Sequence, residues 1–229
     1  MRKIAQKAVT ATAVAASAIA LTAAPAPAAL LAPSVTINPT GTNIAISAVN
    51  SGNIVGANDR TGVALICTGL TATGVLPSGG SGLPWAHIAK VTGVTFSGCT
   101  VLGNPATVTA TASAANPWWL DVTAATTAGS TPGKLTGVDV HIVVPALNCT
   151  GDANGAGSAV GVVPGNHIDR TAAGAPSKLK LPPPPSTGDN IEMANVSATC
   201  PSSIAANNDP VTLAGTLNIT PGLTVLATP

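Results

Sequence analysis

Charged and aromatic side chains are scarce in this sequence of 229 residues. Asp, Glu, Lys and Arg make up 7% of the chain, and aromatic residues make up 2%, with three Trp, one Phe and no Tyr. Ordinary domains carry roughly 25% charged residues. Nine Lys and Arg against eight Asp and Glu leave a formal net charge of +1, without the basic stripe that phosphate binding requires. The sequence therefore predicts no nucleic-acid partner.

Two further classes are excluded by what the chain lacks. Coiled coils are rich in Glu, Lys, Leu and Arg, and this chain has few of the charged members of that set. Intrinsic disorder goes with low hydrophobicity and high net charge, whereas 45% of this chain is hydrophobic. We therefore expect a folded domain.

The first 28 residues have the pattern of a secretory signal peptide. Arg2, Lys3 and Lys7 precede an uncharged run over residues 8–24, and Ala26-Pro27-Ala28 offers a small-x-small cleavage pattern. A membrane anchor is the alternative, but the run is short, weakly hydrophobic and followed by Pro. We predict cleavage after Ala28 and a secreted protein, extracellular or associated with the cell envelope.

Alternation of apolar and polar residues dominates the rest of the chain. Val138, Val140, Ile142 and Val144 share one face of an extended segment, and no convincing helical period follows the signal peptide. Gly- and Pro-rich segments separate such stretches and read as turns. About nine to eleven strands predict an all-β fold, an antiparallel β-sandwich, with a closed β-barrel as the alternative. We assign residues 29–42 to a linker or first strand and 43–229 to one domain.

Four cysteines, Cys67, Cys99, Cys149 and Cys200, lie in the exported part of the chain. An even number in an oxidising compartment predicts disulfides, and the wide spacings argue against zinc. Cys67 and Cys149 both stand in a Leu-x-Cys-Thr-Gly pattern, and each following cysteine precedes a Pro-x-Thr segment. These features favour the pairs Cys67–Cys99 and Cys149–Cys200 over the two other pairings.

A set of strand patterns resembles a known group of proteins. The set comprises Val91–Cys99, the segment Asn116-Pro-Trp-Trp-Leu120, Lys134–His141, Cys149, Val196–Cys200 and Thr216–Pro221. In this order the segments are similar to those of small secreted actinobacterial proteins with two disulfides and an all-β fold. The resemblance covers residues 60–229. It implies an exported all-β protein and no particular activity, since the group has no assigned one.

No catalytic constellation emerges from the sequence. The chain contains no nucleophile elbow, zinc-protease motif or phosphate loop. His141 and His167 are interpreted as surface histidines, the latter in a Pro-Gly loop beside Asp169. Asp152 and Asn154 form a fragment of a calcium loop without its bidentate Glu, which we interpret as a turn. We predict that the protein is not an enzyme and has neither a metal nor a cofactor.

The tryptophans are the best candidates for a binding surface. On an extended strand, Trp118, Leu120 and Val122 face the core, while Trp119 and Asp121 face the polar side. An exposed Trp among polar groups is a platform for sugar rings or proteins. The alternative is that a loop around Trp85 covers Trp119. We propose Trp119, Asp121 and Trp85 as the candidate binding surface.

Two classes of function follow, with a third behind them. The first is a non-catalytic extracellular or cell-envelope binding module that takes a cell-wall glycan, an envelope lipid or another surface protein on one face. The alternative is a structural, self-associating surface protein, because Thr-rich strands with few charges favour edge-to-edge pairing. A secreted hydrolase is the least favoured interpretation.

Overall fold

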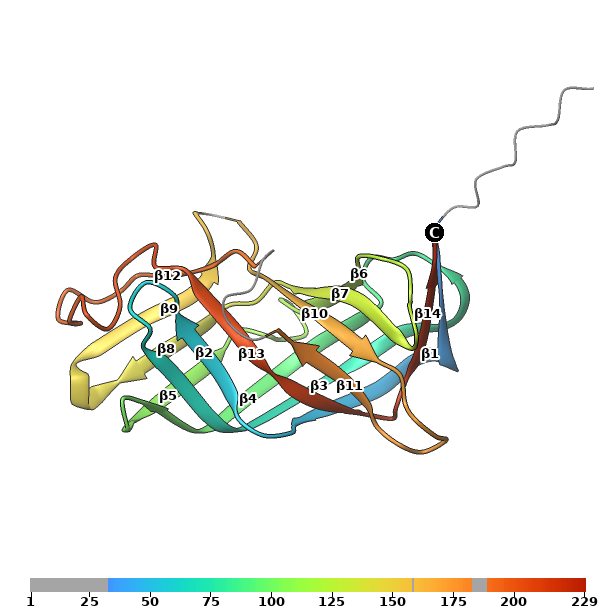
Figure 1. Cartoon of the computed structure of the whole chain (residues 1–229), viewed down its shortest axis with the longest axis horizontal. Coiled ribbons are helices and arrows are strands. Elements are labelled where there is room, and N and C mark those ends of the chain that lie inside the picture. Colours follow the sequence, from blue (N-terminus) through green and yellow to red (C-terminus); the bar gives the residue numbers. More distant parts are fainter. Residues whose placement is uncertain (1–32, 158, 183–188) are drawn as a thin grey trace, which may run out of the picture. The chain divides into compact units, whose positions relative to one another are not determined.

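Antiparallel strands make up nearly the whole of the folded chain. The computed structural model describes residues 33–157, 159–182 and 189–229 (Figure 1), and the predicted signal peptide lies outside them. Strands account for 63% of the structure, and a 3-10 turn, η1, spans Pro145–Leu147. In the part of the chain that is described, no helix is long and apolar enough to cross a membrane.

The described residues form fourteen strands, more than the nine to eleven that the sequence predicted. Their bounds are β1 Ser34–Asn50, β2 Ile54–Asn58, β3 Ala64–Leu83, β4 Ala89–Val101, β5 Asn104–Ala110, β6 Trp118–Val122, β7 Ser130–Thr136, β8 Val140–Val144, β9 Cys149–Gly155, β10 Val162–Ile168, β11 Ser177–Leu181, β12 Ile191–Ala194, β13 Val211–Thr220 and β14 Thr224–Thr228.

All the strands belong to one sheet. Its order is β12-β9-β8-β5-β4-β6-β7-β10-β11-β13-β2-β3-β1-β14, with additional pairings of β4 with β3 and of β13 with β1. The β3–β4 pairing joins strands that are far apart in this order. It therefore closes a hydrogen-bonded circuit through β4, β6, β7, β10, β11, β13, β2 and β3. The all-β, antiparallel prediction is confirmed, while the sandwich arrangement of its layers stays a prediction.

Two of the missed strands, β7 and β10, lie where glycine and proline were interpreted as turns. Pro132-Gly133 lies inside β7, Pro164-Gly165 inside β10, and the segment 77–80 inside β3. Glycine in a strand marks a place where another backbone comes close. A Cβ atom at Gly79 would collide with the carbonyl oxygen of Pro39 on the neighbouring strand β1. The glycines therefore permit close strand pairing here and do not end the strands.

β1 is a single strand that begins at Ser34. It thus includes most of the segment that we assigned to a linker or first strand. Val35 and Ile37, at its start, are fully buried, and both belong to the main hydrophobic core.

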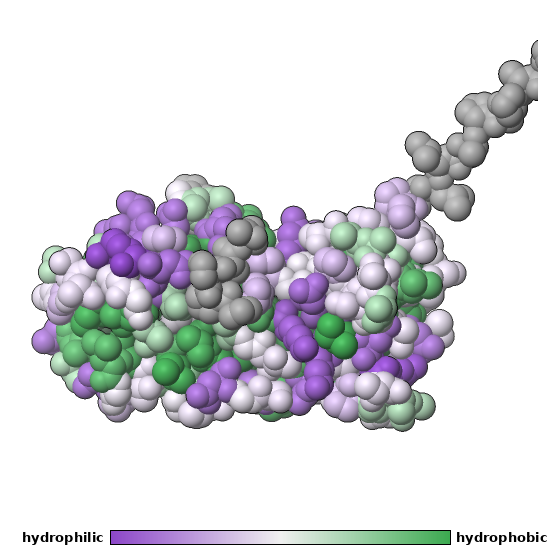
Figure 2. Space-filling view, in the orientation of Figure 1, coloured by the Kyte–Doolittle hydropathy of each residue, from purple (hydrophilic) through white to green (hydrophobic). Residues whose placement is uncertain are grey.

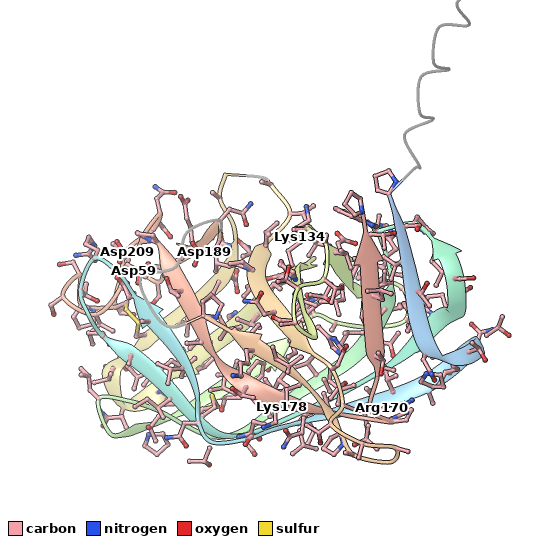
Figure 3. All side chains as sticks on the ribbon, turned by 45° about the vertical axis from the view of Figure 1, so that its right-hand side comes forward. Asp59, Lys134, Arg170, Lys178, Asp189 and Asp209 are labelled. Carbon is pink, nitrogen blue, oxygen red and sulfur yellow. A yellow bond between two sulfur atoms is a disulfide. The ribbon has the colours of Figure 1, made fainter. Side chains whose placement is uncertain are left out.

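On the face drawn in Figure 2, hydrophilic residues are scattered among apolar ones. Figure 3 labels Asp59 and Asp209 at one end and Lys134, Arg170 and Lys178 elsewhere. One of the labelled residues, Asp209, is buried, and it accepts hydrogen bonds from Asn58 Nδ2 at 2.8 Å and from Arg60. The side-chain hydrogen bond with Arg60 is the main cause that lowers the pKa of Asp209 to about 2. This contact ties the end of β2 to the loop before β13.

Both disulfides have the pairing that the sequence favoured. Cys67 on β3 stands directly opposite Cys99 on β4, and the two are bonded. Cys149, at the start of β9, is bonded to Cys200 in the segment after β12. The first bridge thus joins two strands of the closed circuit, and the second fastens the loop after β12 to β9.

We expect the protein to contain no free thiol. Alkylation under native conditions, followed by peptide mapping without reduction, should yield two linked peptide pairs, Cys67 with Cys99 and Cys149 with Cys200. A peptide that joins Cys67 to Cys149 or Cys200 would contradict the pairing, and an alkylated cysteine would contradict the oxidised state.

Candidate functional site

Trp119 lies at the centre of a small aromatic and basic cluster on the sheet. It sits on β6 between β4 and β7, where its register partners are Lys90 and Thr136. The imidazole of His87 stacks on the indole of Trp119, with 4.4 Å between ring centroids and an interplanar angle of 17°. Lys90 Nζ lies 5.9 Å from the Trp119 ring centroid, within the usual range of a cation–π contact. We call Trp119, His87 and Lys90 the Trp119 platform.

The segment before β4 holds His87 over Trp119. His87 has a φ of 59°, in the left-handed region that non-glycine residues seldom occupy. Its backbone N–H donates to Asp121 Oδ1 at 2.6 Å. On either side, Val122 N–H donates to Trp85 O at 2.8 Å and Ile88 N–H donates to Leu120 O at 2.9 Å. The segment is therefore bonded to β6 along its length, and the exposed His87 ring has a fixed position.

A surface pocket adjoins the platform. It has a volume of about 210 Å³ and is lined by Pro77, Ser78, Leu83, Pro84, Ala86, His87 and Ile88. His87 thus takes part in both features, because its ring stacks on Trp119 and also lines the pocket. A ligand in this pocket would therefore contact His87.

The predicted surface residues differ in their exposure. The alternation is right for Trp118, Leu120 and Val122, which are all buried. Trp119 is half-buried, covered on one side by His87 of the loop that contains Trp85. Asp121 was predicted to lie on the binding surface and instead is buried, with 8% of its area exposed. The prediction is wrong because the loop before β4 folds over the outer face of β6 and covers Asp121. The Asp121 carboxylate therefore holds the backbone of His87 in place through its hydrogen bond.

Trp85 is half-buried and anchors the same loop. Its indole Nε1–H donates to Ser34 O at 3.2 Å, which places its polar edge against the start of β1. Trp85 thus supports the platform through the backbone bond to Val122. The His87–Trp119 stack could not be predicted from sequence patterns, because the two residues are 32 positions apart in the chain.

A second polar region surrounds Asp152 on β9. His141, exposed as predicted, lies opposite it in the β8–β9 register, with Nδ1 2.6 Å from Asp152 Oδ1. Burial acts to raise the pKa of Asp152, but hydrogen bonds from Asn195 and His141 outweigh it and lower the pKa. The pKa of Asp139 is raised, first by burial and then by the negative charge of Asp152.

Asn154, Asp139 and Asn195 border a pocket of about 430 Å³ next to this pair. The segment 151–155 was interpreted as a turn, but it lies in β9, where it pairs with β12 and β8. Alternation along a strand sends Asp152 and Asn154 to the same face. Among the described residues, no group of three or more His, Cys, Asp or Glu side chains is placed to hold a metal ion.

His167 corrects a second prediction. It was interpreted as a surface residue in a loop, but it lies in β10 and only 4% of its area is exposed. The Pro-Gly pair before it continues the strand, so His167 faces inward opposite Thr131 of β7. Both of its ring nitrogens are without a hydrogen-bond partner, and Asp169 Oδ1 lies 3.5 Å from Nδ1. Burial lowers the pKa of His167 to about 4, against the opposing effect of Asp169.

Comparison with protein families, with curated proteins and with solved structures finds no match for this chain. The three histidines lie on separate elements: the loop before β4, β8 and β10. Among the described residues, no hydrogen bond joins any of their rings to a Ser or Thr hydroxyl.

Proposed function

We propose that this chain is a secreted, non-catalytic binding protein of the cell envelope that takes a cell-wall glycan on the Trp119 platform. The observation that carries the proposal is the His87–Trp119 stack beside Lys90 and the adjoining pocket. Aromatic faces pack against the apolar faces of sugar rings, while imidazole and ammonium groups donate hydrogen bonds to hydroxyls. The bonds of the His87 segment to β6 support a site that is formed before the ligand arrives.

The location rests on three features of the chain. The N-terminal pattern predicts export, two disulfides fit an oxidising compartment, and the strand patterns resemble those of exported actinobacterial proteins. We therefore propose an actinobacterial cell surface as the place where the protein acts. A secreted hydrolase is less well supported, because among the described residues no histidine ring is hydrogen-bonded to a Ser or Thr hydroxyl.

The alternative, a self-associating structural protein, is less well supported by the edges of the sheet. The outer side of β14 is covered, because Thr126 N–H donates to Ala227 O at 3.0 Å and Asp169 Oδ1 accepts from Val225 N–H at 2.8 Å. At the other end, Met193 N–H of β12 donates to Asp209 O at 2.8 Å. Covered edges disfavour strand pairing between molecules.

Co-sedimentation with purified, insoluble actinobacterial cell wall tests the proposal. We expect the native chain to pellet with the wall polysaccharide and Trp119→Ala to bind about tenfold more weakly or worse, as for a central aromatic contact. Leu102→Ala is the control, because Leu102 is an exposed apolar side chain (62% of its area) on the turn after β4. Undiminished binding by Trp119→Ala, or no binding by the native chain, would reject the platform as a glycan site.

A further inference from the structure

The core contains three apolar cavities in a row. We name each cavity after a residue that lines that cavity and neither of the other two. The Leu70 cavity has a volume of about 80 Å³, the Val108 cavity about 50 Å³ and the Val144 cavity about 70 Å³. The Leu70 and Val108 cavities share walls made by Phe96, Trp118 and Leu213.

The row continues from the second cavity to the third. The Val108 and Val144 cavities share Gly56, Leu65, Ile142 and Val211, whereas the Leu70 and Val144 cavities have no residue in common. The three spaces therefore follow one another inside the domain. The scarcity of large side chains is the reason: with one Phe and no Tyr, the core is filled by Val, Ile, Leu and Ala.

The residues that line the three cavities indicate what kind of ligand would bind there. Apolar residues line the Val108 cavity throughout, and the polar residues in the other two are Ser47, Thr73, Asn58 and Thr150. A buried water needs two to four polar partners, and an apolar cavity of about 150 Å³ stays dry and binds small hydrocarbons. Narrow apolar spaces in a row fit a linear hydrocarbon better than a compact one.

One buried polar group at the wall of these cavities has no hydrogen-bond partner. The indole N–H of Trp118 is buried and has no hydrogen-bond partner, and Trp118 lines both the Leu70 and the Val108 cavity. Buried donors are nearly always paired, so an unpaired donor at the wall between two cavities points to an acceptor that a ligand supplies. A carbonyl, ester or hydroxyl oxygen on the ligand would satisfy it.

We infer that the core binds the single alkyl chain of an amphiphile such as a fatty acid. Filling the row restores the dispersion contacts that empty space forfeits, and the chain's oxygen meets the Trp118 N–H. This site is separate from the Trp119 platform, since neither Trp119 nor His87 lines any of the three cavities. A negative result for fatty-acid binding therefore does not bear on glycan binding at the Trp119 platform, and the reverse also holds.

Fluorescence quenching by dibromostearate, a fatty acid with a heavy-atom quencher on its chain, tests the inference. In the variant Trp85→Phe/Trp119→Phe, Trp118 is the remaining tryptophan of the three. We expect its emission to be quenched by monomeric dibromostearate and to be unaffected by stearate itself. An unquenched Trp118 in a chain with native circular dichroism would overturn the inference.

A cavity-filling variant provides the second measurement. Ala72 on β3 lines the Leu70 cavity, and Ala72→Leu should weaken dibromostearate binding by about tenfold because the new side chain occupies the space. Ala45→Leu on β1 is the matched control, since Ala45 is exposed and lines none of the three cavities. Equal affinity in Ala72→Leu and the native chain would contradict the placement of the ligand.

An independent measurement needs no substitution. Native mass spectrometry of the unaltered exported chain with stearate should detect one bound stearate for each protein molecule. A stoichiometry of zero would overturn the inference even if the substituted chains fail to fold.

Discussion

Trp118→Ala is expected to lower the free energy of unfolding by about 3–5 kcal/mol, the usual cost of truncating a buried Trp. Trp118 is 4% exposed and belongs to the main core. Its side chain lines both the Leu70 and the Val108 cavity, so its removal would enlarge two existing spaces. The neighbouring side chains cannot readily move into the enlarged cavity, because they already leave the two existing cavities unfilled. Urea denaturation followed by circular dichroism measures the loss.

Trp119→Ala is the matched control, one residue along the same strand. Trp119 is half-buried and faces the other side of the sheet. Its contacts are the stack with His87 and the cation–π contact with Lys90. We expect a loss under about 1 kcal/mol, since most changes near the surface cost little. Equal and large losses for both variants would mean that Trp119 is a core residue, and the platform would lose its basis.

Acidification is expected to destabilise the protein through His167. Burial holds the pKa of His167 at about 4, below the ordinary value of 6.5. Above pH 6.5 the imidazole is neutral in both the folded and the unfolded chain. As the pH falls from 6.5 to 4, His167 becomes protonated in the unfolded chain but stays neutral in the folded chain. The free energy of unfolding therefore decreases, by about 3 kcal/mol in total once the pH is below both pKa values. The loss is complete below pH 4.

His167→Phe should remove this dependence and keep the stability measured at pH 7. The phenyl ring is similar in shape, and it eliminates two buried nitrogens that have no hydrogen-bond partner. Urea denaturation at intervals between pH 7 and pH 4.5 measures the effect, a window that lies above the pKa of about 2 of Asp209. His141→Asn, at an exposed position, should retain the acid sensitivity. A slope that persists in His167→Phe would assign the effect to another group.

The strands with strict alternation could be predicted from the sequence. Trp118, Leu120 and Val122 are buried as expected, since residues two apart share a face of any strand. The cysteine pairs also followed from local patterns. The strands β7 and β10 could not be found in this way, because their Pro-Gly pairs have the composition of turns. Whether such a pair turns or continues depends on the neighbouring strand, which local sequence does not reveal.

By itself the sequence determined the all-β class, the two disulfides and the inward face of β6. These features depend on period-two patterning and on cysteine count and spacing, which are properties of the chain order. Only the tertiary structure decided that His87 covers Trp119, that Asp121 and His167 are buried, and that the core retains a row of apolar cavities. Each of these depends on which distant segments meet and on how much volume their side chains fill. Neither quantity is fixed until the strands have paired.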